Sequence, residues 1–134
     1  MRVDGDGDRD GGKLRYSFEG KIAVVHLAGT YSTQELRGTV SALLSDPACP
    51  EKPLMLMDLR ASEVIQTRSS SDLQEVARSL ALIGSRLGRR FAMVAGSEAA
   101  FGLLRLGSVY AAQSGIEPAV FRDLASARAW LLED

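Results

Sequence analysis

The sequence has very few of the residues that build catalytic and metal centres. It contains one cysteine, Cys49, and one histidine, His26, in 134 residues. A lone cysteine excludes an internal disulfide, and the two residues together supply neither a transition-metal cluster nor a catalytic Cys–His arrangement. No Gly-x-Gly-x-x-Gly motif and no P-loop occurs. We therefore expect no cofactor, no metal and no enzymatic activity, and we interpret His26 as a structural histidine inside a strand rather than a proton shuttle.

An excess of charge and a long apolar run are also missing. The net charge is −1, so the charge balance favours neither nucleic acid nor an anionic membrane. No apolar run approaches the roughly 20 residues of a membrane-spanning helix, and no signal-peptide pattern opens the chain. A lone cysteine is typical of a reducing compartment. We expect a cytoplasmic protein with no nucleic-acid partner and no membrane span.

The hydrophobic content of the chain suits one compact domain, since 46% of the residues are hydrophobic. Residues 1–12 are almost all Asp, Gly and Arg and include the run Asp4-Gly5-Asp6-Gly7-Asp8. This spacing resembles a calcium loop, but the glycines are misplaced and no glutamate closes the loop. We therefore expect a disordered acidic tail over residues 1–12 and a single domain over residues 13–134.

Strand and helix patterns alternate through this domain. Residues 14–18 and 22–27 predict a hairpin, and further strands are expected at residues 54–58, 91–95 and 119–121. The continuous apolar runs at 22–27, 54–57 and 91–94 should be adjacent central strands, because only strands covered on both faces tolerate continuous hydrophobics. Helical patterns begin at Ser32 or Thr33, at Ser69, at Ser97 or Glu98, and after Asp123. The order predicts an α/β fold with a small, mostly parallel sheet.

Three segments carry a family resemblance: Gly88-Arg89-Arg90-Phe91-Ala92-Met93-Val94-Ala95, then Ala100-Phe101-Gly102-Leu103-Leu104-Arg105, and Val120-Phe121-Arg122-Asp123 followed by Ala127-x-x-Trp130. Together they resemble the bacterial SpoIIAA-like proteins, which belong with the STAS domains (sulfate-transporter and anti-sigma-factor-antagonist domains) and are in part grouped with Sec14-like lipid-binding folds. The resemblance implies a sandwich in which the first strand of the small sheet is antiparallel, the others are parallel, and helices pack on it. It implies no established catalytic activity.

The segment after the third strand has two interpretations under this resemblance. In the anti-sigma-factor antagonists the matching strand ends in Asp-Leu, and an Asp-Ser pair at the start of the next helix holds the phosphorylated serine. Here Asp58-Leu59 is followed by Gln66-Thr67 at those positions. Thr67 keeps the hydroxyl while Gln66 replaces the acid, so Thr67 is either a phosphorylation switch or an ordinary threonine before a helix.

Polar residues follow the predicted strands where a ligand would meet an open α/β sheet, at the strand carboxyl ends. Helix starts place free N–H groups at this edge, and the arginines of the loop after residue 58 could bind an anion. Alternatively, those arginines pair with Asp58, Glu63 or Asp72 as surface charges. The candidate ligand, anion or switch site comprises Tyr31, Ser32, Asp58, Arg60, Thr67, Arg68, Ser69 and Ser97.

The predicted helix that begins at Ser97 has three apolar residues outside its core-facing stripe: Phe101, Leu106 and Val109. Either neighbouring elements cover this helix deeply, or these residues form an interface with a second copy or another protein. We expect a two-fold homodimer that includes them.

The function expected from these observations is a non-catalytic binding or regulatory module that acts through protein–protein contacts at the strand carboxyl ends. The alternative is a carrier of a small apolar or lipid-like ligand, as the Sec14-like grouping implies. The two differ structurally, because a carrier needs an enclosed apolar pocket of a few hundred Å³ or more and a regulator needs only a surface.

Overall fold

The computed structural model describes residues 14–63, 78, 84–112 and 116–133. The expected tail and the candidate residues Thr67, Arg68 and Ser69 lie outside these ranges. The described elements, in chain order, are β1 (Leu14–Glu19), β2 (Ile22–Gly29), α1 (Thr33–Ser45), β3 (Leu54–Ser62), η3 (Gly84–Arg86), β4 (Arg90–Ala95), α3 (Glu98–Ala112), β5 (Glu117–Phe121) and α4 (Leu124–Leu131).

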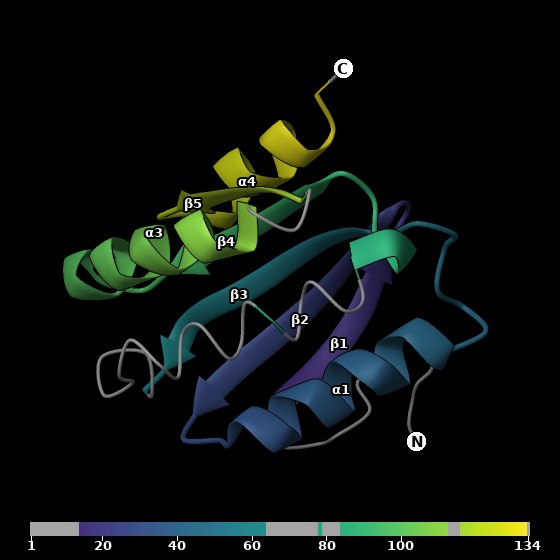
Figure 1. The fold of residues 1–134 in the computed structure, drawn as a ribbon, viewed down its shortest axis with the longest axis horizontal. Coiled ribbons are helices and arrows are strands. Elements are labelled where there is room, and N and C mark those ends of the chain that lie inside the picture. The colour runs from purple at the N-terminus through teal and green to yellow at the C-terminus, as the bar shows by residue number, and fades with distance from the viewer. Residues whose placement is uncertain (1–13, 64–77, 79–83, 113–115, 134) are drawn as a thin grey trace.

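The five strands form one sheet in the order β1-β2-β3-β4-β5 (Figure 1). β1 pairs antiparallel with β2, and the pairs β2–β3, β3–β4 and β4–β5 are parallel. The three continuous apolar runs of the sequence therefore lie in the adjacent central strands β2, β3 and β4. The predicted α/β class and the antiparallel first strand are confirmed.

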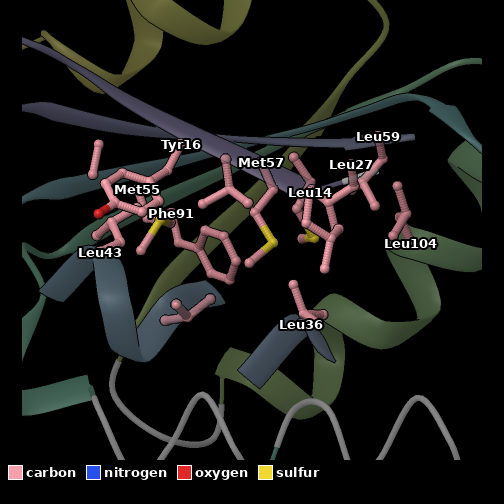
Figure 2. Close-up of a cluster of buried hydrophobic side chains, with 14 of the residues drawn as sticks. Leu14, Tyr16, Leu27, Leu36, Leu43, Met55, Met57, Leu59, Phe91 and Leu104 are labelled. Atoms are coloured by element: carbon pink, nitrogen blue, oxygen red, sulfur yellow. The ribbon is translucent and has the colours of Figure 1, made fainter. Parts of the chain in front are cut away.

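One face of the sheet carries the larger core. Because side chains alternate along a strand, Tyr16, Met57 and Phe91 point to the same face, where they meet Leu36 and Leu43 of α1 (Figure 2). Leu104 of α3 joins the same cluster. Figure 2 shows these side chains filling the space between the strands and the helices. Burying one such side chain contributes about 1.5–3 kcal/mol, so this face holds most of the apolar stabilisation.

The opposite face is covered only in part. The eight-residue helix α4 packs on β3, β4 and β5 through Ala127 and Leu131. β1 and the carboxyl half of β2 lie beyond α4, and on this face of β1 the side chains of Arg15 and Glu19 are exposed. A strip of the sheet is therefore open among the described elements, on the side away from α1.

β3 is longer than the sequence indicated. We expected a loop from Leu59, but the strand continues to Ser62, so that expectation was wrong for residues 59–62. After a register shift in β2, Ala28 pairs with Ala61 and Gly29 with Ser62, and these additional pairs hold the segment extended. As a result, Asp58 and Arg60 lie two residues apart on one strand and face the same way.

The helix starts agree with the sequence in detail. Ser32 caps α1 in a reciprocal capping box with Glu35, the arrangement that satisfies two free N–H groups of a first turn. Asp123 caps α4. The helix expected from Ser69 lies almost entirely outside the described residues.

Gly96 provides a test of how tightly β3 and β4 are packed at their carboxyl ends. A Cβ atom at Gly96 would lie 2.3 Å from the carbonyl oxygen of Arg60. We predict that Gly96→Ala lowers the free energy of unfolding by about 1–3 kcal/mol, the usual cost of overpacking. Gly38→Ala is the matched control, because nothing lies within 4 Å of that position in α1 and alanine favours a helix by up to about 1 kcal/mol over glycine. Urea denaturation of both variants would measure this, and equal stability would contradict the close packing.

Candidate functional site

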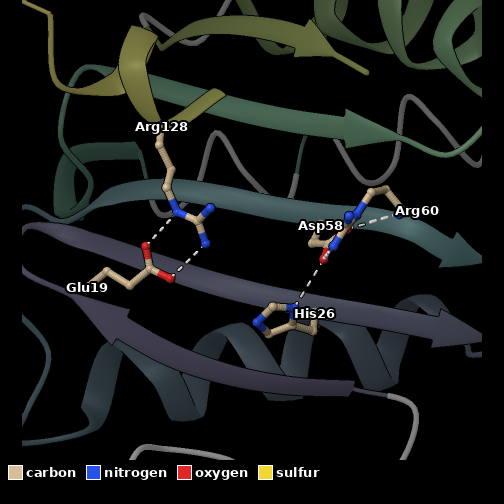
Figure 3. Close-up of polar contacts among 5 residues, drawn as sticks. All are labelled: Glu19, His26, Asp58, Arg60 and Arg128. Carbon is tan, nitrogen blue, oxygen red and sulfur yellow. Dashed lines mark hydrogen bonds and ion pairs between the residues drawn. The ribbon is translucent and has the colours of Figure 1, made fainter. Parts of the chain in front are cut away.

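A row of polar residues crosses the open strip of the sheet. Arg15 of β1 is the register partner of His26 in β2, and His26 is the register partner of Asp58 in β3. Register partners on neighbouring strands face the same side of the sheet. Figure 3 shows His26, Asp58 and Arg60 grouped toward the arrowheads of β2 and β3. The site therefore lies on the sheet face, near the strand carboxyl ends.

Asp58 is the centre of this group. Its carboxylate accepts hydrogen bonds from Arg60 Nε at 2.9 Å, from Arg60 Nη2 at 3.0 Å and from the Arg60 backbone N–H at 3.2 Å. His26 Nδ1 lies 3.2 Å from Oδ2 of the same carboxylate. The Asp58 side chain is only 9% exposed. A buried carboxylate needs such partners, because an uncompensated charge away from water is strongly unfavourable.

The environment keeps Asp58 ionised. Burial raises the pKa of this carboxyl, but the hydrogen bonds from His26 and Arg60 together outweigh burial and hold its pKa well below the ordinary value. The side-chain hydrogen bonds to Asp58 raise the pKa of the Arg60 guanidinium. An ionised carboxylate only accepts hydrogen bonds, so Nδ1 of His26 must carry the hydrogen. In neutral His26, Nε2 is then the acceptor nitrogen.

The side chains of this row surround an open groove of about 530 Å³. The residues that line it are Arg15, His26, Leu27, Ala28, Asp58, Arg60 and Ala61. The Arg60 side chain is 49% exposed, and Asp58 takes two of the five guanidinium N–H groups. The groove therefore presents the unoccupied N–H groups of a half-exposed arginine beside one buried carboxylate.

A second ion pair lies at the other end of the open strip. Arg128 of α4 donates from Nε to Glu19 Oε1 at 2.8 Å and from Nη2 to Oε2 at 3.0 Å (Figure 3). This bidentate contact lowers the pKa of Glu19. It connects α4 to Glu19, the last residue of β1.

The structure brings two of the eight expected site residues, Asp58 and Arg60, together as an ion pair. Tyr31 is buried and its hydroxyl lies 2.7 Å from Ser62 Oγ. Ser32 and Ser97 serve as caps, since each accepts a hydrogen bond from a first-turn N–H. For Arg60, the second interpretation of the sequence, pairing with Asp58, is the one observed.

Two residues of the site, Arg15 and His26, were not among the residues that sequence reasoning assigned to it. Strand alternation places both on one face of the hairpin, and the hairpin register makes them partners. Their proximity to Asp58 depends on the register in which β2 pairs with β3, which the apolar runs did not assign.

The expected interface on α3 is exposed in part. Leu106 is 44% and Val109 59% exposed. Phe101, in contrast, packs against the larger core, with the Arg105 guanidinium over its ring at 5.9 Å. An interface on this helix would therefore be centred on Leu106 and Val109.

Cys49 lies away from the groove. It packs against the core cluster on the α1 side of the sheet, whereas His26 faces the opposite side. Burial raises the pKa of the Cys49 thiol, and its Sγ donates to the Pro50 carbonyl. Within the described ranges, no group of three or more His, Cys, Asp or Glu could hold a metal ion, and no helix there is long and apolar enough to span a membrane.

Comparison with known proteins places the chain by its fold. No family model matches, and no curated protein matches. One matching solved structure is that of an uncharacterised protein of the DUF3478 family with a SpoIIAA-like fold, from Shewanella loihica PV-4. The two chains are 15% identical, the match covers 88% of this chain and 91% of that one, and the TM-score is 0.56. The SpoIIAA-like fold that the sequence resemblance indicated is thereby confirmed.

The ionised state of Asp58 predicts how stability depends on pH. In the unfolded chain this carboxyl takes up a proton near its ordinary pKa of about 4, and in the folded protein only at lower pH. Its contribution is therefore complete above about pH 4 and is lost as the pH falls through the folded pKa. We predict that Asp58→Asn lowers the free energy of unfolding by about 1–2 kcal/mol near neutral pH.

Denaturant unfolding at a series of pH values would test this, and the difference between wild type and Asp58→Asn should shrink on acidification below about pH 4. Glu63→Gln, at an exposed residue just beyond β3, is the control and should change stability by less than about 0.5 kcal/mol. A difference that stays constant down to pH 2 would contradict the ion pair.

Proposed function

We propose that this protein is a non-catalytic binding module that contacts another protein through the groove at the carboxyl halves of β2 and β3. The observation that carries this proposal is the pairing of buried Asp58 with half-exposed Arg60. The buried carboxylate fixes the guanidinium in one orientation, and the remaining N–H groups of Arg60 are left to bind a partner. Arginine is enriched in protein interfaces and among the residues that contribute most to binding.

One feature supports a role without catalysis. The thiol of Cys49 lies on the other side of the sheet from His26, and its pKa is raised. A nucleophile and its base must lie within hydrogen-bonding distance. The arrangement of these two residues therefore favours binding over acyl or thiol chemistry.

The character of the groove supports a protein partner over an apolar ligand. A carrier encloses its ligand among hydrophobic side chains. This groove is open and includes Arg15, His26, Asp58 and Arg60 in its lining, while the apolar side chains of the described core pack on one another (Figure 2).

A photo-crosslinking residue at Ala61, which lines the groove and is exposed, should give a discrete protein adduct in host cells. We expect Arg60→Glu to reduce that adduct at least tenfold, because charge reversal at an interface arginine costs more than about 1.4 kcal/mol. The control carries the crosslinker at Glu51, an exposed residue outside the groove.

Equal adducts at both positions, or an adduct indifferent to Arg60→Glu, would contradict the proposed surface. A small apolar molecule retained in native mass spectra, with no adduct at Ala61, would favour the carrier instead.

We also propose that the protein self-associates through α3. The exposed pair Leu106 and Val109 lies three residues apart on one helical face, where water contact is unfavourable by roughly 25 cal/mol per Å². We predict that wild type sediments as a dimer at high micromolar concentration and that Leu106→Glu with Val109→Glu sediments as a monomer. Leu132→Glu is the matched control, since Leu132 is comparably exposed outside α3. A monomeric wild type would contradict this.

A further inference from the structure

The guanidinium of Arg60 binds Asp58 through only one of its two hydrogen-bonding edges. Nε donates to Asp58 Oδ1 at 2.9 Å and Nη2 donates to Oδ2 at 3.0 Å, so the carboxylate takes the edge that Nε shares with Nη2. A guanidinium holds its five N–H groups in a fixed planar fork. The two N–H groups of Nη1 and the second one of Nη2 therefore point away from Asp58, and Nη1 and Nη2 together form the free edge of Arg60.

This free edge is open to the groove. The Arg60 side chain is 49% exposed, and nothing among the described residues accepts a hydrogen bond from Nη1. Leu27, Ala28 and Ala61 line the groove with Arg60, and their short or apolar side chains carry no group that would bind it. The free edge is thus a donor pair that an added ligand can reach.

His26 directs the oxygens of such a ligand to Arg60. Nδ1 of His26 donates to Asp58, and Figure 3 shows the second ring nitrogen on the side away from that carboxylate. In neutral His26 this nitrogen is an acceptor, so it does not bind the oxygen of an anion.

The other charges on this face are already paired. Arg128 binds Glu19 through two hydrogen bonds, and Arg15 has an interaction of its own. Asp58 and Arg60 pair with each other. The groove therefore selects a ligand by the placement of its donors and not by an excess of charge.

A carboxylate fits the free edge better than a neutral carbonyl does. Its two oxygens accept two parallel N–H bonds in one plane, and such charge-assisted pairs are roughly twice as strong as neutral hydrogen bonds. A carboxylate there would lie about 4 Å from the guanidinium charge and about 7 Å from the Asp58 carboxylate, so attraction exceeds repulsion about 1.7-fold at any one dielectric constant. The pairing with Asp58 weakens this attraction without cancelling it.

We propose that the free edge of Arg60 is a carboxylate-binding site, which the protein partner fills with an aspartate or glutamate side chain. Arg60 then bridges two carboxylates, the fixed one of Asp58 and the exchangeable one of the partner. The identity of the occupant rests on the proposed function, whereas the carboxylate site is present in the protein alone.

The test uses the ¹⁵N-enriched full chain and follows its NMR signals during addition of sodium acetate, with ionic strength held constant by sodium chloride. We expect saturable shifts of the Arg60 Nε–H and of the Ala61 amide, and none at Ala42, an exposed residue of α1. Acetamide, which is neutral and of similar shape, should leave both signals in place.

Two variants show whether the fork is responsible. Arg60→Lys keeps the charge and loses the planar fork, so it should weaken acetate binding, followed at Ala61, by about threefold or more. Arg122→Lys is the matched control, because Arg122 is similarly exposed and pairs with Glu98 outside the groove. It should leave acetate binding unchanged.

Equal shifts with acetate and acetamide, or acetate binding that survives Arg60→Lys, would overturn the proposal. Tighter binding of inorganic phosphate than of acetate would also overturn it and would assign the edge to a phosphorylated partner. In the partner crosslinked at Ala61, changing one aspartate or glutamate to its amide should reduce the adduct severalfold, and an adduct indifferent to every such change would disprove the assigned occupant. Acetate binding without any partner adduct would confirm the carboxylate site and disprove only the proposed function.

Discussion

The site depends on one electrostatic constraint, the burial of the Asp58 carboxylate on a strand of the sheet. Taking a carboxylate out of water is unfavourable by several kcal/mol unless its oxygens accept hydrogen bonds. The structure meets this requirement from two directions, with His26 on the neighbouring strand and Arg60 two residues further along the same strand. Each partner is thereby fixed in position, so the buried charge organises the surface around it.

This surface is accessible because α4 is short and covers only part of the sheet face. Five strands make a face too wide for one helix of eight residues, and α4 packs on β3, β4 and β5 through apolar side chains. The same face changes character along each strand, with Ile22, Val24 and Leu56 in the smaller core and His26 and Asp58 beyond it. The ion pair between Glu19 and Arg128 marks the boundary. The open strip is thus the polar continuation of a core face.

Much of this fold could be predicted from the sequence because the signals are local. Continuous apolar runs identified the three central strands, and the Ser32-Thr33 pair predicted the start of α1. The extent of β3 could not be predicted, because residues 59–62 are held by pairing with β2 after a register shift. Asp58 and Arg60 were expected at the site. His26 and Arg15 could not be assigned to it, because their strands meet the strand of Asp58 only in the folded sheet. The apolar runs predicted that β2 and β3 are neighbours, but not the register that sets His26 opposite Asp58.

The fixed charge of Asp58 also bears on the chemistry of the groove. A carboxylate that stays ionised well below its ordinary pKa does not exchange protons near neutral pH, so it serves poorly as a general acid or base, whose pKa should lie near the working pH. It serves well as a permanent anchor for a guanidinium. Arg60 also keeps its charge over the same range, because the hydrogen bonds to Asp58 raise its pKa. Contacts made by the half-exposed Arg60 should therefore respond to ionic strength, which screens an exposed charge, more than to pH.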